Sequence, residues 1–115
     1  MFAVTFPGQG SQKQGMGRAL CESFSEASSV FDRVSQATGK DLREICFHLP
    51  EDELRQTQNA QLALFTTGVA AYECLKSGIA GMNPTCYAGH SVGEYAALVA
   101  AGYLTVESGA KLVQL

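Results

Sequence analysis

A serine between two glycines, in the stretch Gly89-His90-Ser91-Val92-Gly93, is the first candidate for chemistry in this sequence of 115 residues. The pattern G-x-S-x-G is typical of a nucleophile elbow, in which a strand turns sharply into a helix and exposes the serine hydroxyl. Glycines flank such a serine because the two backbones approach closely there. Ser91 is therefore the candidate nucleophile. The alternative is an ordinary serine in a glycine-rich structural turn.

The same turn supplies a candidate oxyanion site. A helix that begins after Ser91 points its first backbone N–H groups toward the serine, where its dipole also favours negative charge. We expect the N–H of Val92 to stabilise an oxyanion on an acyl intermediate.

The general base is harder to find, because the sequence holds only two histidines. His90 adjoins Ser91, but neighbouring side chains diverge around a sharp turn, and a base must come within about 3 Å of the hydroxyl. We assign His90 to the wall of the pocket. His48 lies among acidic residues and reads as a solvated side chain. If a histidine activates Ser91, we expect it beyond Leu115, because triad residues come together from distant sequence.

The elements around the motif fit a strand–turn–helix. Apolar patterns predict short buried strands at 2–6 and 85–88, and the first strand runs into a glycine-rich loop. Three- and four-residue spacing of apolar residues predicts a helix at 16–38, in two pieces that break near Ser23. Further helices are predicted at 41–49, from Pro50 onward, at 59–77 and at 94–101. Gly78 is expected to stop the helix at 59–77, and Thr105 to cap the start of a last helix. The last helix reaches Leu115 without a stop signal, so we expect an N-terminal piece of a longer protein.

Composition excludes several classes of function. Net charge is −3, and no basic stripe suggests a nucleic-acid binder. No apolar stretch approaches the ~18 residues of a membrane span, and we expect no signal or transit peptide, because "MFAVTF" has no basic region followed by a long apolar stretch. The two histidines and four cysteines match no metal pattern, so we expect buried or half-buried thiols in a reducing, cytoplasmic compartment, and no metal or cofactor. The cysteines are Cys21, Cys46, Cys74 and Cys86.

Two motifs together indicate a family. "FPGQGSQ" (Phe6–Gln12) and "GHSVGEY" (Gly89–Tyr95) stand in the order and approximate separation seen in malonyl-CoA:acyl carrier protein transacylases and in the acyltransferase domains of fatty-acid and polyketide synthases. The intervening "TQNAQLALF" resembles a helix start of that family, although Leu62 stands where a proline is common. The resemblance covers the whole chain.

The resemblance implies a ping-pong reaction, in which Ser91 takes the malonyl group from malonyl-CoA and passes it to the phosphopantetheine thiol of acyl carrier protein. Gln9 matches the glutamine whose backbone N–H completes the oxyanion hole with Val92, and Gln61 matches a glutamine near the pocket. The family's catalytic histidine and malonate-binding arginine are expected beyond Leu115, so residues 1–115 alone should be inactive. Val92 is compatible with malonyl specificity. We expect a monomer at full length.

The resemblance also implies the fold: an α/β domain with a three-layer, hydrolase-like parallel sheet, of which residues 1–115 form the N-terminal part. The family's ferredoxin-like subdomain is not expected in this chain. Three readings of function stay open. The first is a transacylase of fatty-acid or polyketide-synthase type, the second a serine esterase or patatin-like hydrolase, and the third a carrier-binding or regulatory fragment without chemistry.

Overall fold

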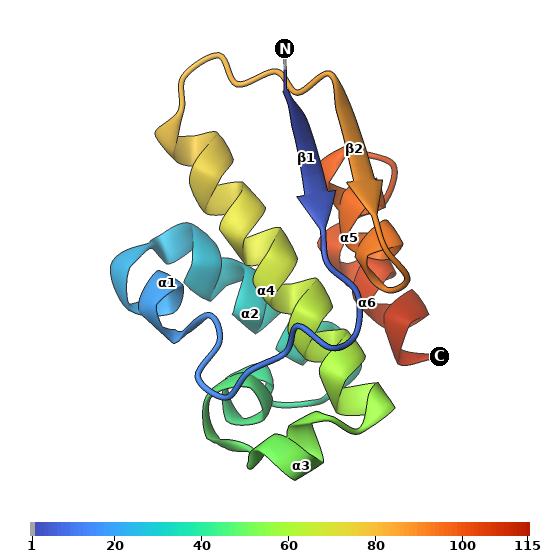
Figure 1. Cartoon of the computed structure of the whole chain (residues 1–115). Helices are drawn as coiled ribbons and strands as arrows, with labels where there is room; N and C mark the ends of the chain where they lie inside the picture. Colours follow the sequence, from blue (N-terminus) through green and yellow to red (C-terminus); the bar gives the residue numbers. More distant parts are fainter. Residues whose placement is uncertain (1) are drawn as a thin grey trace.

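The computed structural model describes residues 2–115 and contains two short parallel strands beside a group of helices (Figure 1). β1 (Ala3–Phe6) pairs with β2 (Cys86–Gly89), with Ala3 opposite Cys86 and Phe6 opposite Gly89. The connection between them is long and helical, as a parallel pair of strands requires. An α/β fold with a parallel sheet is confirmed, and both strands lie within a residue of their predicted positions.

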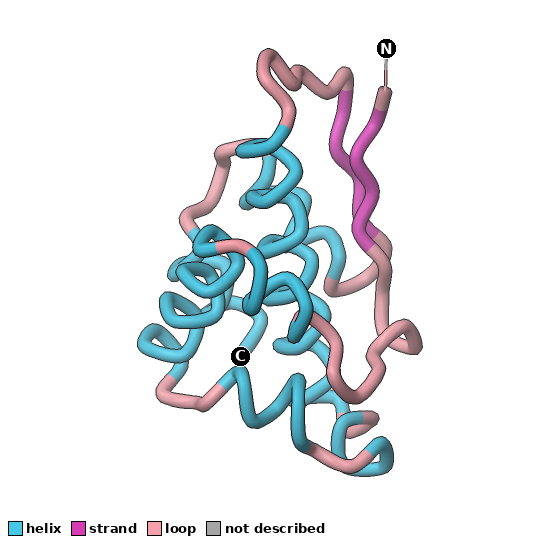
Figure 2. The backbone as a smooth tube through the Cα atoms, turned by 90° about the vertical axis from the view of Figure 1, so that its left-hand side faces the viewer, coloured by secondary structure: helices cyan, strands magenta, loops and turns pink. Residues whose placement is uncertain are grey.

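The sheet is covered on one face only by residues 2–115. Figure 2 shows the helices gathered on one side of the two strands. Side chains alternate between the two faces of a strand, and the exposed positions are Ala3, Thr5, Cys86 and Ala88. The prediction of fully buried strands is therefore wrong for this outer face, since no described element packs against it.

The helices largely follow the predicted pattern. Phe24 adopts an extended backbone that separates the first two, which confirms the break near Ser23, and Thr105 caps the last by accepting a hydrogen bond from Ser108 N–H at 3.0 Å. Gly78 is the last helical residue rather than the stop, which falls at Ile79. In chain order the elements are α1 (Arg18–Ser23), α2 (Ser25–Thr38), the π-helical turn η1 (Glu44–His48), α3 (Glu51–Leu54), α4 (Thr57–Gly78), α5 (Gly93–Ala100) and α6 (Val106–Gln114).

α4 is the central element of the core. It packs against α2, α5 and α6, and Phe65 on α4 and Phe31 on α2 are almost completely buried. Burial of one such side chain stabilises the fold by about 1.5–3 kcal/mol. Among residues 2–115, no helix combines the length and apolar character needed to cross a bilayer, and no cluster of potential ligands could hold a metal ion.

The four cysteines are free thiols in different environments. Cys46 is buried, and burial raises the pKa of its thiol to about 12, so it stays protonated at neutral pH. Cys21 and Cys74 are half-buried, as expected. Cys86 lies on the uncovered face of the sheet and is exposed, so the predicted burial is wrong for this residue.

Three backbone segments approach one another at the carboxyl ends of the strands. A Cβ added at Gly93 would overlap the carbonyl oxygen of Phe6, and one added at Gly89 would overlap the backbone of Gly93. A Cβ at Gly8 would lie 2.7 Å from the carbonyl oxygen of His90, closer than real Cβ atoms come to any such atom. The absence of side chains at these glycines lets the end of β1, the end of β2 and the start of α5 meet.

Gly93→Ala tests this close approach. The new methyl group meets backbone that cannot rotate away, so we expect the free energy of unfolding to fall by about 1–3 kcal/mol, as overpacking usually costs. Urea denaturation followed by circular dichroism measures it. Gly78→Ala is the matched control, because a Cβ at this helical glycine meets nothing within 4 Å, and it should be neutral or stabilising by up to about 1 kcal/mol. Equal losses at both positions would contradict the explanation.

Candidate active site

Ser91 stands at the turn between β2 and α5 in a strained backbone conformation. Its φ of 57° makes it the one non-glycine residue with positive φ among residues 2–115. Such a conformation is unusual for a residue with a side chain and clusters at functional sites. The turn is braced on both sides, since His90 N–H donates to Phe6 O at 3.1 Å and Glu94 N–H donates to Ser91 O at 3.0 Å. Ser91 itself is exposed, as a nucleophile would have to be.

The two backbone N–H groups predicted to form the oxyanion hole donate no hydrogen bond within residues 2–115. One belongs to Val92, the residue directly before α5. The other belongs to Gln9, the residue after Gly8, whose backbone lies close to that of His90. The positive end of the α5 dipole lies at the same place. The side chain of Gln9 points elsewhere, because its Nε2 lies 3.5 Å from Thr57 Oγ1 at the start of α4. For Gln9, the group available near the turn is therefore the backbone amide.

Ser91 opens into a cavity of about 330 Å³. The structure brings three of the candidate residues together there, because Gln61 on α4 and Val92 on α5 also line it. Gln9 and His90 do not. The other lining residues are apolar or aromatic and come from α5 and the end of α6: Tyr95, Leu112, Val113 and Leu115.

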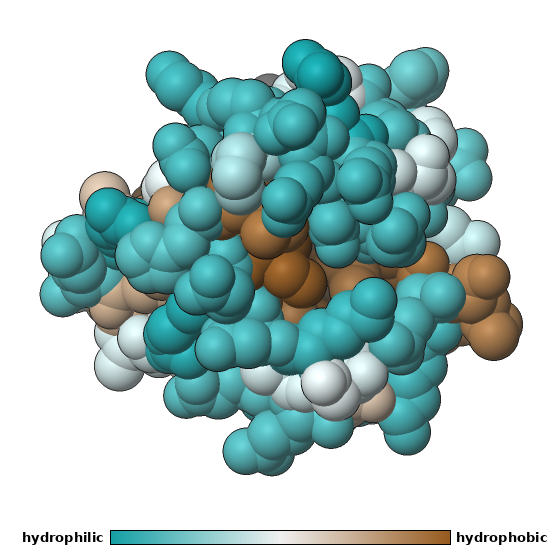
Figure 3. Space-filling model, turned by 90° about the horizontal axis from the view of Figure 1, so that it is seen from below, coloured by the Kyte–Doolittle hydropathy of each residue, from teal (hydrophilic) through white to brown (hydrophobic). Residues whose placement is uncertain are grey.

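These additional lining residues were missed from the sequence. Tyr95 carried a usable signal, since it follows Ser91 by four residues and helical residues four apart share a face. Leu112 and Val113 carried none, because their approach to Ser91 depends on how α6 packs against α4 and α5. Figure 3 views the molecule from below, and a patch of apolar residues shows there among hydrophilic surroundings. Leu112 keeps 42% of its surface exposed.

His90 faces a different cavity. This space of about 450 Å³ lies against the carboxyl ends of both strands, where Pro7 and Ala88 also line it. His48 is on η1, remote from both, and its carbonyl oxygen accepts from Gln14 Nε2 at 3.2 Å. Neither histidine of the chain therefore lines the cavity of Ser91.

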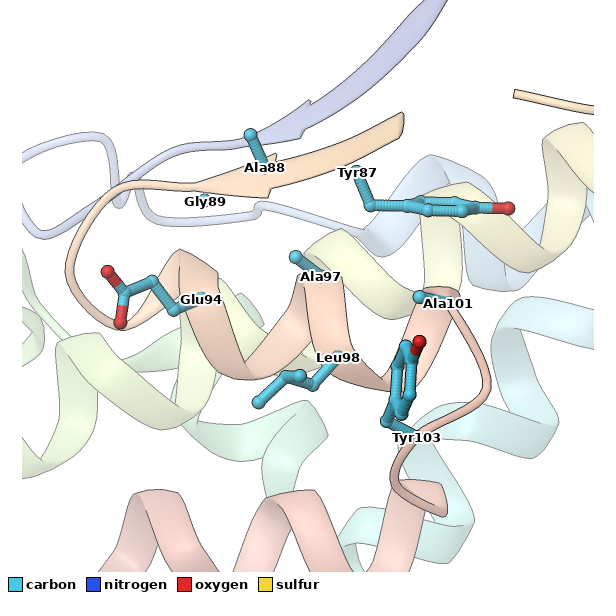
Figure 4. Close-up of a pocket in the computed structure, with 8 residues that line it drawn as sticks. All are labelled: Tyr87, Ala88, Gly89, Glu94, Ala97, Leu98, Ala101 and Tyr103. Atoms are coloured by element: carbon cyan, nitrogen blue, oxygen red, sulfur yellow. The ribbon is translucent and has the colours of Figure 1, made fainter. Parts of the chain in front are cut away.

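Another cavity, of about 550 Å³, lies between β2 and α5, and no serine lines it (Figure 4). Ala97 and Leu98 of α5 and Ala101, the residue after it, line this cavity, and Glu94 is the one acidic residue in its lining. Tyr87 at its edge is held by Tyr72, whose hydroxyl lies 2.9 Å from that of Tyr87. Burial first, and then this neighbour, raises the pKa of Tyr72 to about 12, so Tyr72 stays protonated at neutral pH. Because this space is predominantly apolar and has no nucleophile, it is not part of the Ser91 site.

Comparison with known proteins gives consistent matches over the whole chain. A malonyl CoA-acyl carrier protein transacylase of Bacillus subtilis (strain 168) is 43% identical over 97% of this chain and 35% of the relative. The protein of the same name in Escherichia coli (strain K12) is 40% identical over 99% of this chain and 37% of the relative. The chain thus spans about a third of the length of these relatives.

Solved structures give the same picture. The malonyl CoA-acyl carrier protein transacylase of Coxiella burnetii has a TM-score of 0.92 and 44% identity, over 98% of this chain and 35% of that one. A malonyl-transacylase in complex with a type II polyketide acyl-carrier protein has a TM-score of 0.90 and 39% identity, over 98% of this chain and 36% of its own. The sequence pattern of the acyl transferase domain matches residues 4–115, and the chain belongs to that family.

Proposed function

We propose that this chain carries the nucleophile and the oxyanion hole of an enzyme that moves a malonyl group from malonyl-CoA to the phosphopantetheine thiol of acyl carrier protein. The observation that carries the proposal is the positive φ of Ser91, at a strand–turn–helix beside a cavity. The relatives named as transacylases support malonyl transfer as the reaction. The relative solved in complex with its acyl-carrier protein supports acyl carrier protein as the partner.

In the proposed first half-reaction, Ser91 Oγ attacks the thioester carbonyl carbon of malonyl-CoA. A C–O bond forms, the C–S bond breaks, and coenzyme A leaves as the thiol after taking up a proton. In the second half-reaction the carrier thiol attacks the malonyl-serine ester and frees the hydroxyl. The N–H groups of Gln9 and Val92 stabilise the oxyanion in both halves. Gln61 contacts the acyl group from the wall of the cavity.

The proton transfers and the malonate carboxylate need groups that the site does not contain. Neither His90 nor His48 lines the cavity, and no arginine does. We propose that the base and a carboxylate-binding arginine come from residues other than these 115, and that His90 serves as a wall of the neighbouring cavity. In this proposal residues 1–115 are the N-terminal part of the acyltransferase domain. A cytoplasmic location is supported by the four free thiols.

The pathway served is proposed as fatty acid biosynthesis. Polyketide biosynthesis is the alternative, since a polyketide malonyl CoA-acyl carrier protein transacylase of Bacillus subtilis is 39% identical. The hydrolase reading has no observation in its favour, and the experiment below separates it from transfer.

A chimera tests the function directly. Residues 1–115 replace the matching segment of the Bacillus subtilis transacylase, which supplies the remaining two thirds of a relative. On incubation with malonyl-CoA, intact-protein and peptide mass spectrometry should find one malonyl group on Ser91, and added acyl carrier protein should remove it. Ser91→Ala should abolish the adduct and lower transfer about a thousandfold or more. Release of malonate to water without carrier protein would favour a hydrolase, and the absence of any adduct would favour a fragment without chemistry.

The isolated 115-residue chain provides the complementary test. Because its serine has neither a base nor a carboxylate-binding arginine in the cavity, we expect transfer at least about a hundredfold below that of the chimera, since general-base catalysis alone contributes about 10²–10⁴-fold. Radiolabelled malonyl transfer to acyl carrier protein measures both proteins, and circular dichroism checks that the isolated chain is folded. Transfer by the folded isolated chain at the rate of the chimera would refute the assignment of these groups to other residues.

A further inference from the structure

α6 supplies one apolar wall of the Ser91 cavity. Leu112 and Val113, which we call the α6 wall, line the same cavity as the polar residues Gln61 and Ser91. Within residues 2–115, no hydrogen bond or ion pair joins α6 directly to the Ser91 turn. The distance from the wall to the serine is therefore set by whatever holds α6 in place.

At its first turn, α6 is held to α2 by a two-pronged ion pair. Arg33 Nε donates to Glu107 Oε2 at 2.6 Å, and Arg33 Nη2 donates to Glu107 Oε1 at 2.8 Å. The planar guanidinium fixes both the direction and the distance of the carboxylate, which a single contact would not. The hydrogen bonds from Arg33 hold the pKa of Glu107 at about 2, so the pair stays ionised at any pH at which the protein works.

At its last turn, α6 is held to the same helix. Gln114 Nε2 donates to the carbonyl oxygen of Thr38, the last residue of α2, at 3.0 Å. Between the two attachments, the absence of a side chain at Gly109 lets α6 rest on Phe65 and Val99, because a Cβ there would come within 2.9 Å of both. α6 is thus fixed at both ends by α2, a helix that contributes no residue to the cavity.

We propose that Arg33 and Gln114 are positioning residues, which set the gap between the α6 wall and Ser91 and so limit the acyl group that the site accepts. The inference rests on the proposed acyl transfer. With both attachments in place, the gap between the α6 wall and Ser91 keeps a fixed width that suits a short malonyl ester. If either attachment is lost, the α6 wall can move away from Ser91, so that a branched acyl group also fits and the malonyl group is oriented less well. Small displacements of this kind strongly lower the rate of acyl transfer.

Charge reversal in the chimera tests the proposal. Arg33→Glu and Glu107→Arg should each lower the ratio of kcat/KM for malonyl-CoA to that for methylmalonyl-CoA about two- to fivefold, as expected for loss of a half-exposed ion pair. The double variant restores the pair in reverse and should bring the ratio back to within about twofold. Gln114→Ala should lower the ratio in the same direction.

Arg43→Glu is the matched control. Arg43 forms an ion pair with Asp32, the neighbour of Arg33 on α2, and neither residue contacts α6 through a hydrogen bond. The glutamate introduced at position 43 would repel Asp32 on α2, as the glutamate introduced at position 33 would repel Glu107 on α6. This variant should leave the ratio of the two kcat/KM values unchanged, whatever it does to stability. An unchanged ratio in Arg33→Glu, or an equal change in Arg43→Glu, would overturn the proposal.

A second measurement does not depend on catalysis. In the chimera, hydrogen–deuterium exchange of the α6 amides should be faster in Arg33→Glu than in Arg43→Glu, with α5 exchange equal in the two. If the unsubstituted chimera transferred no malonyl group, the proposed function would fail, while the exchange data would still decide whether Arg33 holds α6. Equal α6 exchange in both variants would overturn the positioning role by itself.

Discussion

The site depends on the contact of three stretches of backbone that only glycine permits. Gly93 lies against the carbonyl of Phe6, Gly89 against Gly93, and Gly8 against His90. A side chain at Gly93 would push the end of β1 away from the start of α5, and one at Gly89 would push the end of β2 away from it. That contact places the loop after β1, which contains Gln9, beside the turn that carries Ser91 and Val92. In the proposed oxyanion hole, covalent geometry and packing would hold the N–H groups of Gln9 and Val92, so little reorganisation would be needed as charge develops.

The parts of the site that could be predicted from the sequence are the local ones. Ser91, Val92 and the flanking Gly89 and Gly93 lie within five residues, so the steric requirements of the short turn determine the residue types in the pattern. The cap at Thr105 and the break near Ser23 were readable for the same reason. Leu112 and Val113, and the pairing of Arg33 with Glu107 across 74 residues, were not, because these contacts follow from the packing of α6 and leave no local pattern.

Burial of the strands was predicted incorrectly for a related reason. Apolar strands in a parallel sheet are usually covered on both faces, but residues 2–115 cover only the face that carries Val4, Phe6 and Tyr87. The residues on the outer face are small, so their pattern alone does not distinguish a covered surface from an open one. Which face is covered depends on the whole arrangement of helices rather than on the strand itself.

The position of His90 shows why adjacency in sequence is a poor guide to a catalytic pair. His90 directly precedes Ser91, yet it lines the cavity beside Pro7 and Ala88 while Ser91 lines the one beside Gln61. The positive φ that exposes the serine turns the chain between the two residues and sends their side chains to different spaces. The same strain that makes Ser91 accessible therefore removes its neighbour as a base. A nucleophile on such a turn must take its base from a segment that reaches the cavity from another direction.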